Sequence, residues 1–270
     1  MLLKAKNGKV RIRNTDMDYI CFGKGTKPLI MITGLGDGLM TVRGKALPFA
    51  LMYRMYAKDF RVYVPSRSND LPAGFTARDM AEELFLAMQQ LGIGRADIVG
   101  ISQGGMIAQH LAIDHPEVVD RLVLTVTAAR AGEEIRNAIS AWKDMAKRDA
   151  FNELMRDNLL RMYTEQYLKK NPWMLYTAGR FGKPKRYDRF LTMAEACVTH
   201  DTYEELPKIA APTLIIGGGQ DLVIGTSAAR ELAERIPSAK LHLYPTLGHA
   251  LYEEATDFND VVLRFLRSGL

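Results

Sequence analysis

One serine of the sequence stands in a context that suits a catalytic nucleophile. Residues 100–104 (GISQG) follow an apolar segment of strand length, 96–99, and lead into a stretch with helical character. This is the strand–turn–helix setting of the G-x-S-x-G turn, whose glycines permit a tight turn that exposes the serine Oγ. A helix that begins behind the serine also favours developing negative charge. Ser102 is therefore the candidate nucleophile.

A serine at neutral pH needs a general base within hydrogen-bond reach, and His249 is the candidate for that role. It lies in residues 246–249 (TLGH), a glycine-containing loop after the last predicted strand. Such a loop can place the imidazole at the edge of a sheet that also bears Ser102. For His200, contact with substrate is a less favoured alternative to a position at a helix end. The other histidines are expected at structural or surface positions: His110, His115 and His242.

The base in turn needs an acid that orients it and stabilises its protonated form. Asp221 follows three glycines, 217–219, directly after a predicted strand, so a sharp loop can direct its carboxylate to the same sheet edge. Its structural alternative is the N-cap of a helix beginning near Ser227. Glu133 and Glu134 follow another predicted strand and are alternative acids, but their charged helical surroundings make them the weaker choice.

A glycine-rich loop could supply the oxyanion hole. Residues 33–38 (TGLGDG) follow the third predicted strand. The backbone N–H of Leu35 in this loop and that of Gln103, next to the nucleophile, are the expected donors to a developing oxyanion.

The elements that must position these residues alternate between β-rich runs and helical patterns, which indicates an α/β fold with a mostly parallel eight-stranded sheet and flanking helices. The first two strands are close enough to form an antiparallel hairpin at one edge. The predicted strands are residues 9–13, 17–22, 28–33, 60–64, 95–100, 120–126, 212–217 and 240–245.

One stretch, residues 129–206, shows amphipathic helices and no good strand. We expect it to form a helical cap over the sheet edge where ligands of open α/β sheets bind, with residues 1–128 and 207–270 as the core. Methionine and aromatic side chains in such a cap would suit an apolar, adaptable pocket, although packing of the cap on the core is the favoured explanation for most of them. The pocket candidates are Met106, Trp173 and Met174.

Composition narrows the function classes. The chain has 270 residues, of which 47% are apolar and 25% charged, as in ordinary globular enzymes. No apolar run is long enough to span a bilayer, and residues 1–16 lack a secretory signal core. Cys21 and Cys197 make no disulfide or zinc-finger pattern. We therefore expect a cytoplasmic protein.

The formal net charge is +5, but acids and bases alternate along most of the chain, so we expect no nucleic-acid partner. One basic cluster stands out. We interpret it as a solvated loop, with the steering of an acidic substrate as the minor alternative. The cluster comprises Arg180, Lys183, Lys185, Arg186 and Arg189.

From about residue 9 to 268 the chain resembles the α/β-hydrolase superfamily, specifically its small capped members with a serine nucleophile. The resemblance rests on residues 99–106 (VGISQGGM), the Asp221 that follows 217–219, the pair 248–249 (GH), and the Ser–Asp–His chain order. Two places depart from the family's pattern: Thr33 stands where histidine is common, and residues 66–70 (SRSND) lack the usual Arg-Gly-x-Gly.

The resemblance implies hydrolysis of an ester or lactone through an acyl-enzyme, without a cofactor, and a small, apolar acyl substrate. Hydrolysis of a carbon–carbon bond and cofactor-free perhydrolysis use the same triad and remain open alternatives. A small-ligand sensor on the same fold is the alternative from a different class of protein.

Overall fold

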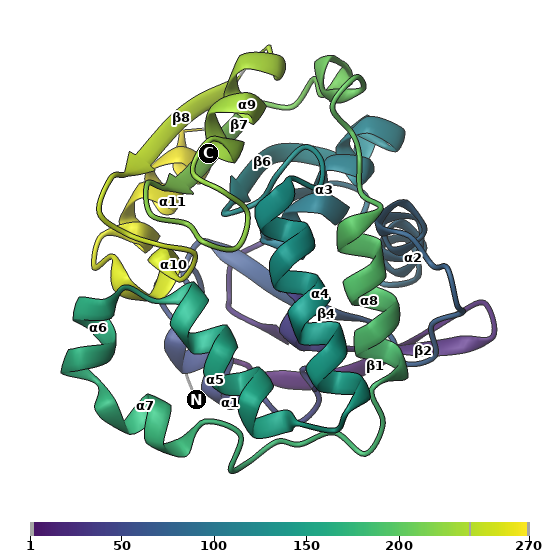
Figure 1. The fold of residues 1–270 in the computed structure, drawn as a ribbon. Coiled ribbons are helices and arrows are strands. Elements are labelled where there is room, and N and C mark those ends of the chain that lie inside the picture. Colours follow the sequence, from purple (N-terminus) through teal and green to yellow (C-terminus); the bar gives the residue numbers. More distant parts are fainter. Residues whose placement is uncertain (1–2, 238, 269–270) are drawn as a thin grey trace.

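An eight-stranded sheet organises the molecule, and the computed structural model describes residues 3–237 and 239–268 (Figure 1). The strand order is β1-β2-β4-β3-β5-β6-β7-β8, in which β1 and β2 pair antiparallel and β3 to β8 run parallel. The predicted α/β class and antiparallel edge are confirmed. The strands are β1 Lys6–Ile12, β2 Thr15–Phe22, β3 Lys27–Ile32, β4 Phe60–Ser68, β5 Ala96–Ile101, β6 Val119–Thr125, β7 Thr213–Gly218 and β8 Ala239–Tyr244.

All eight strands occur where the sequence predicts them. The central ones, such as β7, are buried on both faces, which is why they are continuous apolar runs. Only β4 is markedly longer than predicted, because β2 pairs with it antiparallel as far as Met17 opposite Ser68. Pairing to a distant strand, rather than local propensity, thus extends β4 past Pro65.

Helices flank the sheet, and α3 begins directly after the candidate nucleophile. Almost every residue of α3 is buried, and the helix packs against α2, β5 and β6. It ends before Pro116, which cannot continue a helix. These elements are α1 Ala46–Met52, α2 Ala77–Gln90, α3 Gln103–Asp114, α9 Ala228–Arg235, α10 Leu251–Glu254 and α11 Phe258–Arg267, with short helical turns η1 Leu35–Gly38, η2 Pro116–Val118 and η3 Leu206–Lys208.

Five helices fill the stretch between β6 and β7 and lie together on one side of the molecule (Figure 1). They are α4 Glu133–Lys147, α5 Phe151–Met162, α6 Glu165–Lys170, α7 Pro172–Thr177 and α8 Asp188–Val198. In this fully described stretch, β pairing is limited to an isolated bridge between Arg130 and Asp201. Helix α8 packs against α4 and against η1, and a Cβ at Gly38 would lie 2.8 Å from the Phe190 Cα. None of the described helices is long and apolar enough to cross a membrane.

Candidate active site

Ser102 occupies a sharp turn between β5 and α3. Its φ of 55° and ψ of −121° are unusual for a residue with a side chain, and such strained backbone is characteristic of functional sites. A Cβ at Gly104 would lie 2.1 Å from the Ile32 carbonyl oxygen, and one at Gly100 would lie 2.6 Å from the Gly104 carbonyl oxygen. Both glycines are therefore required by close backbone contact, which explains the G-x-S-x-G pattern.

The structure brings Ser102, His249 and Asp221 into one hydrogen-bonded chain. The His249 Nε2 lies 3.0 Å from the Ser102 Oγ, and the His249 Nδ1 lies 2.8 Å from the Asp221 Oδ2. A carboxylate only accepts hydrogen bonds, so Nδ1 bears the proton and Nε2 is free to accept the serine hydroxyl proton. His249 and Asp221 are almost completely buried, so solvent does not compete for these contacts.

Backbone amides hold the Asp221 carboxylate in place. Its Oδ1 accepts hydrogen bonds from the Val223 and Ile224 N–H groups, at 2.8 and 3.0 Å, which leaves Oδ2 for the histidine. Asp221 is thus not the cap of α9. The alternative acids, Glu133 and Glu134, are exposed at the start of α4.

Two backbone N–H groups are free to receive an oxyanion above Ser102. Within the described chain, neither the Leu35 N–H nor the Gln103 N–H donates a hydrogen bond, since each opens a helical turn. The glycine loop passes directly over the serine, because a Cβ at Gly34 would lie 3.4 Å from the Ser102 Cβ. Both predicted donors therefore belong to segments that meet at Ser102.

A buried charge network underlies this loop. The Arg67 guanidinium donates to the Thr33 carbonyl oxygen and, at 3.2 Å, to the Thr33 Oγ1, so the two departures from the family's sequence pattern contact each other. The Arg67 backbone N–H donates to the Asp37 Oδ2 at 2.9 Å. Burial lowers the pKa of Arg67 to about 10, so it remains a cation at neutral pH.

Arg189 of α8 completes the network. It donates to the Asp37 carboxylate and carbonyl oxygen, and to the Ser68 and Arg67 carbonyl oxygens at 3.0 and 2.9 Å. The interpretation of Arg189 as part of a solvated loop is therefore wrong, because its side chain is only 13% exposed and forms an ion pair with Asp37. The remaining members of the basic cluster are exposed. Sequence reasoning missed this role, because nothing local links residue 189 to residue 37.

The side chain of Gln103 is anchored as well. Its Nε2 donates to the Met193 carbonyl oxygen at 2.5 Å and to the Cys197 Sγ at 3.2 Å, both on α8. Its Oε1 lies 3.4 Å from the Arg67 Nη2. Gln103 is thus hydrogen-bonded both to Arg67 of the charge network and to helix α8.

A cavity of about 400 Å³ opens onto Ser102 and His249. Its lining is largely apolar and comes from the glycine loop, α1, α4, α5 and α10. Its apolar residues include Leu35, Met40, Val42, Phe49, Trp142, Met155, Leu159, Met162, Val223 and Tyr252.

The three predicted pocket residues do not line this cavity. Met106 is buried within the contacts of α3, and Met174 is half-buried on α7. Trp173 is 62% exposed. Helix α7 packs against α5 and α6, and none of its residues lines the cavity. Composition pointed to residues 129–206 as a source of pocket residues, but it did not show that α4 and α5, rather than α7, supply them.

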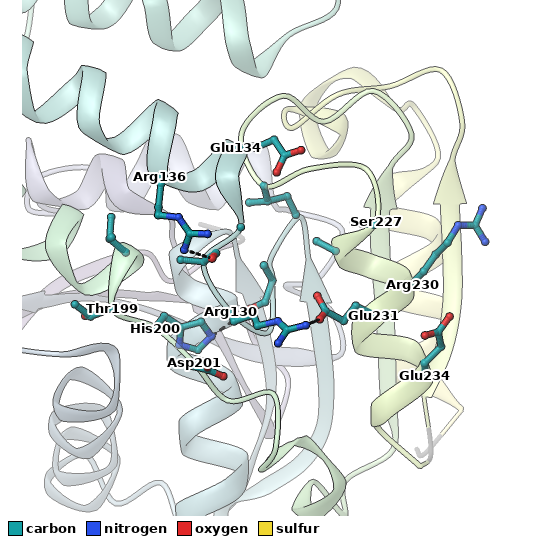
Figure 2. A pocket seen from close by; sticks show the side chains of 16 residues that line it. Arg130, Glu134, Arg136, Thr199, His200, Asp201, Ser227, Arg230, Glu231 and Glu234 are labelled. Atoms are coloured by element: carbon teal, nitrogen blue, oxygen red, sulfur yellow. Dashed lines mark hydrogen bonds and ion pairs between the residues drawn. The ribbon is translucent and has the colours of Figure 1, made fainter.

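A larger, more open cleft of about 860 Å³ lies elsewhere, between the residues that follow β6 and helix α9 (Figure 2). In this cleft Arg130 forms an ion pair with Glu231 at 2.8 Å, and Arg136 donates to the Ala131 carbonyl oxygen at 2.6 Å. It contains Ser227 but none of the three hydrogen-bonded residues. The smaller cavity is therefore the candidate active site.

The other histidines have structural contacts. His200 borders the larger cleft, with its Nε2 3.2 Å from the Ala128 carbonyl oxygen and its ring edge-on to that of His110. Burial lowers the pKa of His110 to about 4 and that of His200 to about 3, so both are neutral at pH 7. His115 contacts Glu82, and the ring of His242 packs on Tyr244.

No cluster of three His, Cys, Asp or Glu side chains suited to a metal ion occurs among the residues that the structure describes. Cys21 and Cys197 are both buried and free. Burial raises the pKa of the Cys197 thiol to about 12, so it remains protonated.

Comparison with known proteins agrees with the observed fold. A family profile described as the α/β-hydrolase fold matches residues 27–256. The chain therefore belongs to the α/β-hydrolase family, and it is a hydrolase.

Particular relatives are hydrolases too. A Klebsiella pneumoniae protein provisionally named carbamate hydrolase RutD is 28% identical over 263 residues, covering 91% of this chain and 92% of its own. The 3-oxoadipate enol-lactonase 2 of Acinetobacter baylyi is 24% identical over 248 residues, covering 91% of each chain. Among solved structures, the enol-lactonase of Burkholderia xenovorans is similar with a TM-score of 0.82 and 25% identity, over 96% of this chain and 100% of that one.

Proposed function

We propose that this hydrolase cleaves ester-type bonds, as a carboxylesterase or lactonase, with Ser102, His249 and Asp221 as its catalytic triad. The hydrogen-bonded chain from Asp221 through His249 to Ser102, at the base of a cavity, is the observation that supports it most directly. The lactonase relatives are consistent with this class of bond.

In the first half-reaction, the Ser102 Oγ attacks the carbonyl carbon while the His249 Nε2 takes the hydroxyl proton. The resulting oxyanion accepts hydrogen bonds from the Leu35 and Gln103 N–H groups, which need no reorganisation to receive it. Collapse of this intermediate breaks the bond to the leaving alkoxide, which takes the proton from His249. The products are an alcohol and an acyl-enzyme.

In the second half-reaction, His249 deprotonates a water molecule that attacks the acyl carbon. A second oxyanion forms in the same hole and collapses to expel the Ser102 Oγ, which recovers the proton from His249. Asp221 stabilises the imidazolium in both halves. The free acid leaves, and the enzyme returns to its starting state.

Residues 129–206 act as a cap in this proposal. Trp142 of α4 and Met155 and Met162 of α5 line the cavity, so this segment bounds the space in which the acyl group lies. Such a roof limits the access of bulk water and selects substrates by shape. The residues on α4 and α5, rather than those on α7, therefore determine which acyl groups fit.

A serine-directed fluorophosphonate tests the nucleophile. The wild type should be labelled and Ser102→Ala should not, and kcat on a 4-nitrophenyl ester should fall by about 10⁴-fold or more in the variant. Ser227→Ala is the matched control, because Ser227 lies in the larger cleft, outside the triad, and its loss should change neither result. Equal labelling of Ser102→Ala would reject the assignment.

A substrate panel tests the reaction class. Esters of increasing acyl length, lactones, carbamates and diketones should be compared, and we expect esters or lactones to show the highest kcat/KM. If only diketones are cleaved, the enzyme is a carbon–carbon bond hydrolase. If no acyl compound is turned over and small ligands merely bind, the sensor alternative is correct.

A further inference from the structure

A single lysine ammonium borders the candidate active site without a partner. Lys45 directly precedes α1, is half-buried and lines the same cavity as Ser102 and His249. Among the residues that the structure describes, none forms a hydrogen bond or ion pair with its Nζ. The other lining residues of this cavity include no further lysine or arginine.

The apolar surroundings of Lys45 make its unpaired charge energetically unfavourable. Val42 and Phe49, from the same segment, line the cavity beside it. Burial lowers the pKa of Lys45, and the Asp37 charge only partly opposes that effect. A partly desolvated cation among apolar side chains gains stability when an anion enters the cavity.

The Asp37 carboxylate forms no hydrogen bond or ion pair with Lys45, and it offsets other positive charges as well. Its Oδ2 accepts hydrogen bonds from the Arg67 backbone N–H and the Arg189 guanidinium, and its charge also acts on the buried Arg67 guanidinium, so one carboxylate offsets two arginine charges. Together with Lys45, the side of the cavity next to the glycine loop therefore has an excess of positive charge. A field of this kind favours a negatively charged ligand and the developing oxyanion alike.

A second carboxylate indicates how an anionic ligand would lie. Glu253 of α10 also lines the cavity, and it accepts a hydrogen bond from the Tyr163 hydroxyl at 2.5 Å. The Glu253 charge acts on Tyr53, which follows α1, whereas Lys45 precedes α1, so the two charges lie toward opposite ends of this helix. The end at Glu253 repels an anion, and the end at Lys45 attracts one. The cavity thus has opposite charges on two different elements and an apolar lining between them.

We infer that the substrate is an ester or lactone that bears a free carboxylate, which Lys45 binds while the scissile carbonyl lies at Ser102. The inference rests on the proposed hydrolase function and specifies its substrate class. The carboxylate lies toward Lys45 and away from Glu253, and an aliphatic segment between the two groups contacts the apolar lining.

Matched substrates isolate the effect of the carboxylate. One series consists of 4-nitrophenyl half-esters of straight-chain dicarboxylic acids, and its control replaces the free carboxylate by a primary amide of nearly the same shape. A second series places the carboxylate or amide on the leaving alcohol of acetate esters. The readout is the ratio of kcat/KM for the acid-terminated ester to that for its amide-terminated match.

The wild type should favour the acid-terminated ester in at least one series, by about fivefold or more, the effect of a modest ion pair. Lys45→Met should lower this ratio by about fivefold, and Lys45→Arg should largely restore it. Lys58→Met is the matched control, because Lys58 is exposed at the end of β4 opposite to the site. It removes the same net charge and should leave the ratio unchanged.

The outcomes separate the inference from the proposed function. If the wild type hydrolyses acid- and amide-terminated esters equally in both series, or if Lys45→Met leaves the ratio unchanged, the inference is wrong and the hydrolase assignment stands. If neither kind of ester is hydrolysed, the proposed function fails first. A drop in the ratio that Lys58→Met reproduces would indicate a general charge effect and would also overturn the role of Lys45.

Discussion

Replacing Asp37 by asparagine tests the charge balance beneath the glycine loop. The Asp37 side chain is fully buried, and its Oδ2 accepts hydrogen bonds from the Arg67 backbone N–H and the Arg189 guanidinium. Asparagine keeps the shape and one acceptor oxygen but removes the charge. The charges of the Arg67 and Arg189 guanidinium groups, which repel each other, are then no longer offset by the Asp37 carboxylate.

The expected cost follows from that imbalance. Removing one partner of a buried ion pair destabilises a protein by about 3–5 kcal/mol, which corresponds to a melting temperature about 10 °C lower in a chain of this size. Arg189→Met leaves the Arg67 and Asp37 charges balanced, and water can reach the released carbonyl oxygens because Arg189 is 13% exposed. We expect it to cost only about 2 kcal/mol.

Urea unfolding of the two single variants and the double variant measures this. The double variant should lose less stability than the sum of the single losses, since removing Arg189 relieves the repulsion that Asp37→Asn creates. Both single variants should also lower kcat by about tenfold or more, because η1 and its Leu35 N–H are held by these contacts. Additive losses, or a loss under about 1 kcal/mol for Asp37→Asn, would refute the reasoning.

Three further predictions concern other residues. Asp221→Asn should lower kcat by about 10⁴-fold with little change in melting temperature, as steady-state kinetics would show, whereas a similar loss in Glu133→Gln would transfer the acid role. Burial lowers the pKa values of His110 and His200 to about 4 and about 3, below the ordinary value of 6.5. Between pH 5 and pH 6.5 the unfolded chain therefore binds more protons than the folded chain. The free energy of unfolding should therefore fall by up to about 1.5 kcal/mol per histidine from pH 6.5 to pH 5, and His110→Gln should flatten this slope in urea titrations. Trp173→Ala should change the free energy of unfolding by less than about 1 kcal/mol and leave the acyl-length profile unaltered, because the indole is mostly exposed.

The sequence alone predicted all eight strands, the α/β fold and the three residues that the structure joins by hydrogen bonds. The predictions of the three residues succeeded for one physical reason. Ser102, Asp221 and His249 each lie in a turn or loop that follows a parallel strand, and the carboxyl ends of such strands meet at one edge of the sheet. Local signals, namely apolar runs and glycine turns, were therefore enough to predict that these three distant residues lie close together.

Only the tertiary structure showed which side chains surround that edge. Arg67 and Arg189 meet at Asp37, and Lys45 lines the cavity, although nothing in their own sequence neighbourhoods distinguishes them from solvated charges. Trp173, conversely, has the composition of a pocket residue and lies in solvent. Whether a charged or apolar side chain faces the site depends on how α1, α5, α7 and α8 are oriented against the sheet. That orientation is set by packing between segments far apart in the chain, which a local pattern does not encode.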